Sequence, residues 1–175
     1  TVAKDVLYYS LPLIPNQISW WIVNSSDRYV ILFFLGKTFN GIYSVATKFP
    51  TVITTITSIV YMSLQETIIK EYNSKDRDQF YSRTFQKYYV LLFVLVICAI
   101  PATKVVISLF VGNEYRSAWM YTASLLLGTV FMALSSFLGI GYQISKETSR
   151  SVVSTMSAAE INLLVNLVLV QYVGL

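Results

Sequence analysis

Long apolar stretches separated by short charged segments limit how this chain can fold more than any other feature. The stretches run over about residues 8–35, 40–66, 87–103, 117–145 and 151–172. About 20 mostly apolar residues suffice to cross a bilayer. Only 13% of the 175 residues are charged, roughly half the share in an average soluble domain. Because the stretches are long and lack period-2 alternation, they predict helices rather than barrel strands. We therefore expect an all-α integral membrane protein, with five transmembrane helices in a single bundle over residues 1–175.

Composition also limits the chemistry. The chain has no histidine and a single cysteine, Cys98. These counts exclude Ser-His-Asp and Cys-His nucleophile systems, the usual zinc sites and a disulfide within the chain. We expect no enzyme activity, no metal and no other cofactor.

The basic residues are unevenly distributed along the chain. An odd number of spans places the two ends on opposite sides of the membrane. Eight basic residues share one side: Lys4, Lys70, Lys75, Arg77, Arg83, Lys87, Lys146 and Arg150. Three lie on the other: Lys37, Lys104 and Arg116. The positive-inside rule then predicts a cytoplasmic N-terminus and a cytoplasmic connection over residues 66–86. The net charge of +4 is therefore a topology signal, and we expect no nucleic-acid partner.

Prolines predict irregularities in three of the spans. Pro12 and Pro15 should kink or unwind the start of the first span, because proline lacks the backbone donor that a helix interior needs. Pro50 should bend the second span, and Pro101 should end the third.

Polar residues inside apolar helices are costly, so their positions are informative. Helical spacing places them on one face in each of three spans. These residues are Asn16, Trp20, Asn24 and Asp27 in the first span, with Arg28 beside them, Ser44, Lys48, Thr51 and Thr55 in the second, and Asn162 and Asn166 in the fifth. Three such faces predict a bundle around a hydrated cavity. The Ser and Thr residues are equally open to a plainer role as helix-packing faces.

Four charged residues fall within the predicted spans. At about 1.5 Å per residue, Asp27, Lys48 and Glu160 lie roughly 13–18 Å from their helix ends, near mid-bilayer. Asp27 and Lys48 are on consecutive antiparallel helices and could form an ion pair, which would leave Arg28 as the uncompensated cation. Either a functional site or structural ion pairs would explain these four charges. Trp20 and Trp21 fit either packing or a cavity wall that stacks on a sugar ring or a cation.

Two segments resemble a known family. Residues 11–29 read LPLIPNQISWWIVNSSDRY, which is similar to the seventh span of bacterial polysaccharide flippases, the translocases of O-antigen and capsule repeat units. Residues 41–50 read GIYSVATKFP and resemble the Gly-x-Tyr-x-x-Ala-x-Lys-x-Pro opening of that family's eighth span. The resemblance extends over the whole chain, but residues 85–175 match only as a hydrophobic pattern.

The resemblance implies the multidrug/oligosaccharidyl-lipid/polysaccharide exporter fold, with two bundles of six helices and alternating access. This chain would form most of the second bundle, in a multi-pass protein of the bacterial cytoplasmic (inner) membrane. Its substrate would be an undecaprenyl-diphosphate-linked oligosaccharide, moved from the inner to the outer leaflet for polysaccharide biosynthesis. The implied partners are this lipid-linked oligosaccharide, membrane lipid, a polysaccharide polymerase and a chain-length regulator.

The resemblance also implies roles for individual residues. Arg28 and Lys48 would attract the diphosphate or acidic sugars, while the polar faces, with Asn24 and Trp20 or Trp21, would contact sugar. Burial, rather than the family motif, suggests Asp27 and Glu160 for a proton or cation relay.

Two other functions fit the same pattern. A drug or organic-cation exporter of the same fold would use the carboxylates to bind its substrate, and a non-transporting subunit of an envelope-assembly complex would need only the packing. The chain begins without methionine and stops just after an apolar stretch, so we expect it to be a segment of a longer transporter.

Overall fold

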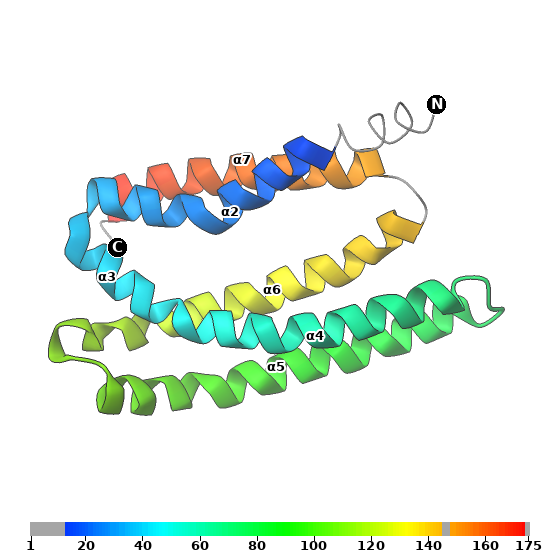
Figure 1. Cartoon of the computed structure of the whole chain (residues 1–175), viewed down its shortest axis with the longest axis horizontal. Coiled ribbons are helices and arrows are strands. Elements are labelled where there is room, and N and C mark those ends of the chain that lie inside the picture. Colours follow the sequence, from blue (N-terminus) through cyan, green and yellow to red (C-terminus); the bar gives the residue numbers. More distant parts are fainter. Residues whose placement is uncertain (1–12, 145–147, 174–175) are drawn as a thin grey trace. The chain divides into compact units, whose positions relative to one another are not determined.

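The computed structural model describes residues 13–144 and 148–173, and these residues form helices and short connections (Figure 1). No strand occurs in these two ranges. In order, the elements are α2 (Leu13–Phe34), α3 (Gly36–Ala46), α4 (Lys48–Glu71), α5 (Arg77–Phe110), the 3₁₀ helix η1 (Asn113–Ala118), α6 (Trp119–Ile144) and α7 (Thr148–Val173). The predicted all-α class is confirmed.

Three helical segments are long and apolar enough to cross a membrane. They are Gly36–Glu71, which comprises α3 and α4, Arg77–Phe110, and Asn113–Ile144, which comprises η1 and α6. A shorter apolar stretch, Val152–Val168, lies in α7. Many large apolar side chains on these helices are exposed, as they would be against lipid, whereas soluble monomers rarely expose large apolar patches. The structure thus describes a membrane-type helical protein, and the number of five spans stays a prediction.

The chain divides into two compact units. Unit 1 combines Thr1–Asn40 with Ser145–Leu175, and unit 2 is Gly41–Ile144. In unit 1, α2 packs along α7. In unit 2, α4, α5 and α6 pack against one another, and η1 packs against α5 and α6. The predicted functional residues are therefore spread over both units.

The core of unit 2 centres on Phe137 of α6, which is fully buried. The rings of Tyr81, Phe85 and Tyr88 on α5 lie 5.2–5.5 Å from the Phe137 ring, and Tyr88 stacks on it at 25°. Leu92, Val96, Leu126, Val130 and Ile140 continue this core along α5 and α6, and Ile68 adds to it from α4. Aromatic packing of this kind adds to the apolar burial and holds α5 against α6.

A second apolar cluster of unit 2 contains Ile42, Ala46, Ile107 and Ala118. Beside it, α3 approaches the segment after α5 so closely that a Cβ atom on Gly41 would lie 2.7 Å from Cε1 of Tyr115. Only glycine allows this approach without a shift of the tyrosine ring. Gly41 therefore has a packing role in unit 2.

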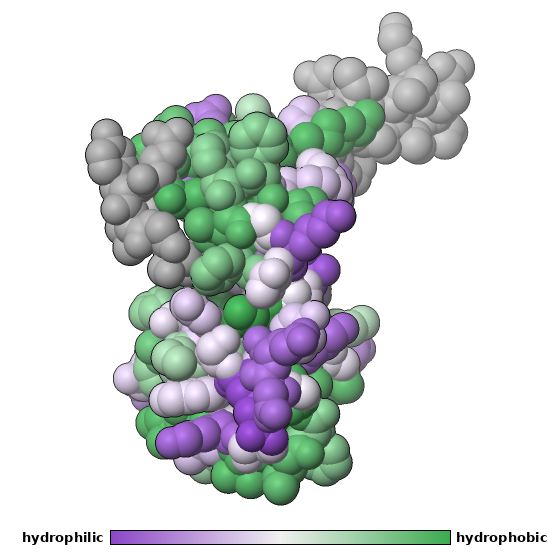
Figure 2. Space-filling model, turned by 90° about the vertical axis from the view of Figure 1, so that its left-hand side faces the viewer, coloured by the Kyte–Doolittle hydropathy of each residue, from purple (hydrophilic) through white to green (hydrophobic). Residues whose placement is uncertain are grey.

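The connection between α5 and α6 is polar. Figure 2 views this end of unit 2, where hydrophilic side chains gather. Asn113, Glu114 and Arg116 are exposed there, and the Lys104 ammonium lies 4.9 Å from the centre of the Trp119 ring in a cation–π contact.

The second predicted span is interrupted at Thr47, three residues before Pro50, and the predicted bend at Pro50 itself stays a prediction. The helix stops at Ala46, Thr47 forms a turn, and α4 starts at Lys48. Pro50 then falls in the first turn of α4, where its missing N–H is tolerated. At the other end of α3, its first residue Gly36 has a φ of +84°, and the turn at Leu35 separates α3 from α2. Pro15 similarly lies in the first turn of α2, whereas Pro12 lies outside the described residues.

Two predictions about α5 are wrong. Pro101 does not end the helix, which continues to Phe110. An interior proline can kink a helix rather than end it, and Thr103 and Ile107 beyond Pro101 are buried, so packing holds the helix past the proline. The 66–86 connection is also shorter than predicted, because α4 and α5 continue through its charged residues to Glu71 and from Arg77.

Exposed ion pairs lie next to both ends of this connection. Lys70 Nζ lies 2.7 Å from Glu66 Oε1 at a spacing of four residues, a spacing that supports helices. Arg77 Nε lies 2.9 Å from Asp78 Oδ1, and its guanidinium lies over the Tyr72 ring. The hydrogen bond and the charge of Asp78 raise the pKa of Arg77 above its usual range.

Candidate functional site

A polar network joins the two helices of unit 1. The Ser26 hydroxyl on α2 donates to Oδ1 of Asn162 on α7 at 3.0 Å, and the Asn166 amide donates to Oδ1 of Asp27. The same Asn166 amide lies 3.3 Å from Oδ1 of Asn162. Four polar side chains thus meet between two apolar helices.

The network satisfies groups that would be costly alone. Ser26 is buried and Asp27, Asn162 and Asn166 are half-buried, so each needs a partner where water is scarce. Hydrogen bonds between membrane helices also stabilise their association. Asn162 and Asn166, predicted to line a cavity, here face α2.

The remaining predicted residues of α2 lie around this network. Arg28, Asn24 and Trp21 are exposed, and Trp20 is half-buried. The Asn24 amide donates to the Trp20 carbonyl at 2.7 Å, and the Trp21 ring lies 6.1 Å from the Tyr29 ring. The exposed Glu160 lies on α7. The side chain of Asn16 lies outside the described residues.

The predicted residues of the second span lie in unit 2. Lys48, the first residue of α4, is exposed. The hydroxyls of Thr51 and Thr55 donate to the Thr47 and Thr51 carbonyls at 2.8 and 2.9 Å. The Ser44 carbonyl accepts the Thr47 hydroxyl at 3.1 Å. Asp27 belongs to unit 1 and Lys48 to unit 2, so the Asp27–Lys48 pair stays a prediction.

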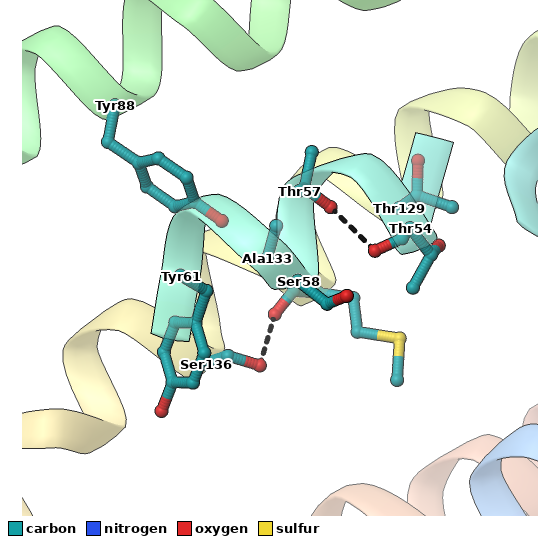
Figure 3. Close-up of a pocket in the computed structure, with 9 residues that line it drawn as sticks. Thr54, Thr57, Ser58, Tyr61, Tyr88, Thr129, Ala133 and Ser136 are labelled. Atoms are coloured by element: carbon teal, nitrogen blue, oxygen red, sulfur yellow. Dashed lines mark hydrogen bonds between the residues drawn. The ribbon is translucent and has the colours of Figure 1, made fainter. Parts of the chain in front are cut away.

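Sequence reasoning missed a cavity of about 170 Å³ inside unit 2 (Figure 3). It is lined from α4, α5 and α6 by Thr54, Thr57, Ser58, Tyr61, Tyr88, Thr129, Met132, Ala133 and Ser136. The Thr54, Thr57 and Ser58 hydroxyls donate to carbonyls of their own helix, as do those of Thr129 and Ser136 on α6. With a water occupying about 30 Å³, the volume is that of a few waters.

A pair of glutamines also joins α4 to α6. The Gln65 amide donates to Oε1 of Gln143, and the half-buried Tyr61 on α4 lies beside this pair. The helical spacing predicted a polar face on α4, but neither Ser26 nor Gln143 was identified from the sequence, because each partner lies far away along the chain.

Within residues 41–50, small residues and the lysine occupy different environments. Gly41 packs on Tyr115, Ala46 is fully buried, and Pro50 is buried. Lys48 alone among these four is exposed. The segment thus has one side that packs inside the protein, and its lysine, Lys48, points outward.

No family model, curated protein or solved structure matches the chain. The functional assignment consequently depends on the residues of the chain and on where the structure places them.

Proposed function

We propose that the chain is part of a flippase that moves lipid-linked oligosaccharide repeat units across the bacterial cytoplasmic membrane by alternating access. The observation that carries this proposal is the arrangement of residues 41–50. Gly41, Ala46 and Pro50 are packed, while Lys48 is exposed well inside the Gly36–Glu71 segment, which is long enough to span the bilayer. An exposed lysine at membrane depth is costly unless it meets an anion or water.

The proposed substrate supplies a suitable anion. A diphosphate carries negative charge and several acceptor oxygens, which ammonium and guanidinium groups bind through charge-assisted hydrogen bonds. Lys48 in unit 2 and Arg28 in unit 1 are both exposed cations within predicted spans. In the proposal they bind the diphosphate or acidic sugars.

Sugar contacts would come from the side chains around these cations. Asn24 and Trp21 are exposed on α2 near Arg28 in sequence, and an indole face can stack on a sugar ring. The proposal assigns the Ser26, Asp27, Asn162 and Asn166 network first to pairing α2 with α7. Five spans, most of a second six-helix bundle and a cytoplasmic N-terminus belong to the same proposal.

The experiment is complementation in a strain whose surface polysaccharide depends on the gene. We expect Lys48→Ala and Arg28→Ala to lower polysaccharide output at normal protein level, whereas Lys75→Ala, which removes an exposed cation from the α4–α5 turn, should leave output unchanged. Wild-type output from both of the first two variants would refute the proposed role.

One observation favours a second function. Glu160 is exposed on α7, and an outward carboxylate within an apolar helix could bind an organic cation, as in a drug exporter of the same fold. If Glu160→Gln sensitises cells to cationic drugs and leaves polysaccharide unchanged, the exporter function replaces the flippase function.

A further inference from the structure

On the outward face of α5, two basic residues are followed by three apolar residues. Arg83, Lys87, Val90, Val94 and Ile97 are all exposed, and they follow one another at spacings of four, three, four and three residues. Such spacing places them on one side of a helix. We refer to these five residues as the α5 outer stripe.

The opposite side of α5 packs into the core of unit 2. Tyr88, Leu92 and Val96 are almost entirely buried in the unit 2 core. The packing of α5 is therefore directed away from the outer stripe, whose three apolar residues are 52–64% exposed.

The two cations of the stripe differ from others nearby. Lys70 and Arg77 each have an acidic partner within 3 Å. Within the described ranges 13–144 and 148–173, Arg83 and Lys87 make no ion pair. No Asp or Glu stands three or four residues away from either of them along α5. The positive charge of this pair is thus uncompensated by its own helix.

Helix length places the two cations at headgroup level. The segment from Val90 to the exposed Leu109 rises about 28 Å at 1.5 Å per residue, close to the hydrocarbon thickness of a bilayer. Its single charged residue, Lys104, lies only about 8 Å from the Leu109 end, where a long basic side chain extends to the interface. Lys87 then lies roughly 5 Å beyond the hydrocarbon edge and Arg83 roughly 10 Å beyond it. Long basic side chains at this level reach lipid phosphates.

We propose that the α5 outer stripe binds an anionic phospholipid, with Arg83 and Lys87 on its headgroup phosphate and an acyl chain along Val90, Val94 and Ile97. An anionic diacyl lipid matches both parts of the stripe, since its charge complements the two cations and its chain covers the apolar residues below them. The lipid site does not depend on the flippase function, because it lies on α5 rather than at Lys48 or Arg28.

The single cysteine provides a direct probe of the lipid site. Cys98 is exposed and adjoins Ile97, about 16 Å below Lys87 along the helix axis. The full chain, labelled with bimane at Cys98, is reconstituted into phosphatidylcholine bilayers that contain a small fraction of phosphatidylglycerol. Bromine atoms on the acyl chains of one lipid at a time report which lipid contacts the label.

We expect brominated phosphatidylglycerol to quench the label roughly thirtyfold more effectively than its mole fraction predicts, given the usual effect of two basic residues at a surface. Arg83→Gln combined with Lys87→Gln should abolish this preference. The matched control, Lys70→Gln with Lys75→Gln, removes two charges from the same end of unit 2 and should keep it.

A wild-type salt titration makes the test independent of how the variants fold. Raising the salt from about 0.05 M to about 1 M should reduce the preference to the mole-fraction value, because the Debye length falls to about 3 Å. Equal quenching by both lipids at low salt would overturn the proposal. Loss of the preference in the control pair, or quenching by neither lipid because protein covers the stripe, would also overturn it.

Discussion

The amide of Asn166 on α7 donates a hydrogen bond to the carboxylate of Asp27 on α2, although 139 residues separate them along the chain. The adjacent Ser26–Asn162 bond repeats this connection one helical turn away on α7. Unit 1 is thus held by two polar contacts as well as by apolar packing. The contact gives Asp27 a structural role, because it joins α2 to α7.

Removal of the Asp27–Asn166 contact should destabilise unit 1. We expect Asp27→Ala and Asn166→Ala each to lower the free energy of unfolding, with a coupling of about 0.6–2 kcal/mol between them, the range found for hydrogen bonds between membrane helices. The measurement is unfolding in mixed micelles with increasing dodecyl sulfate, carried through a double-mutant cycle. Asn24→Ala is the control, since within residues 13–144 and 148–173 the bond of its amide is to the Trp20 carbonyl of the same helix. Additive effects of the first two variants would contradict a direct contact.

The two glycines Gly41 and Gly128 should respond oppositely to alanine. Gly41→Ala brings a methyl group to 2.7 Å from the Tyr115 ring, so we expect a loss of about 1–3 kcal/mol of stability, as for other overpacked sites. Gly128→Ala meets nothing within 4 Å and should be neutral, or more stable by about 0.5–1 kcal/mol through helix propensity. Thermal unfolding in detergent compares the two variants. If Gly41→Ala is as stable as Gly128→Ala, the close approach of α3 to Tyr115 is wrong.

Phenylalanines on opposite sides of α6 should likewise differ. Phe137 is fully buried among three aromatic rings, whereas Phe131 is 65% exposed. Phe137→Ala should cost about 3–5 kcal/mol, the usual loss for a buried phenylalanine. Phe131→Ala should cost much less, because lipid solvates the site in either case. The same unfolding measurement tests this, and similar losses in both variants would argue against the Phe137 core.

The sequence alone predicted the helical class of the chain, since long apolar stretches leave few alternatives. It also indicates the proline-rich start of α2 and the polar face shared by Asn162 and Asn166. These features are local, and local spacing suffices to recognise them. Boundaries are less predictable: the charged residues of 66–86 indicate a connection, but Lys, Glu and Arg also favour helices, and α5 begins at Arg77.

Features that depend on contacts distant in sequence could not be predicted. Nothing near Ser26 indicates that it bonds Asn162, and nothing near Gly41 indicates the Tyr115 ring. The cavity between α4, α5 and α6 also depends on which hydroxyl faces meet across helices. Sequence spacing identifies a polar face, but the partner of that face is determined by packing.

The direction of the chain across the membrane gives the last prediction. Replacement of Cys98, the single cysteine, by serine provides a background without thiols, in which Lys75→Cys and Asn113→Cys probe the two connections that flank α5. Both positions are exposed, and α5, with 34 residues, is about 51 Å long, which is enough to span a core of about 30 Å. From the distribution of basic residues, we expect a membrane-impermeant maleimide added to intact cells to label position 113 and to label position 75 only after the membrane is opened.

The control is Ile97→Cys in the same background. This position lies in the apolar part of α5 and should react slowly in both cases. The reverse pattern at 75 and 113 would invert the proposed orientation, and labelling of both positions in intact cells would show that α5 does not cross the membrane.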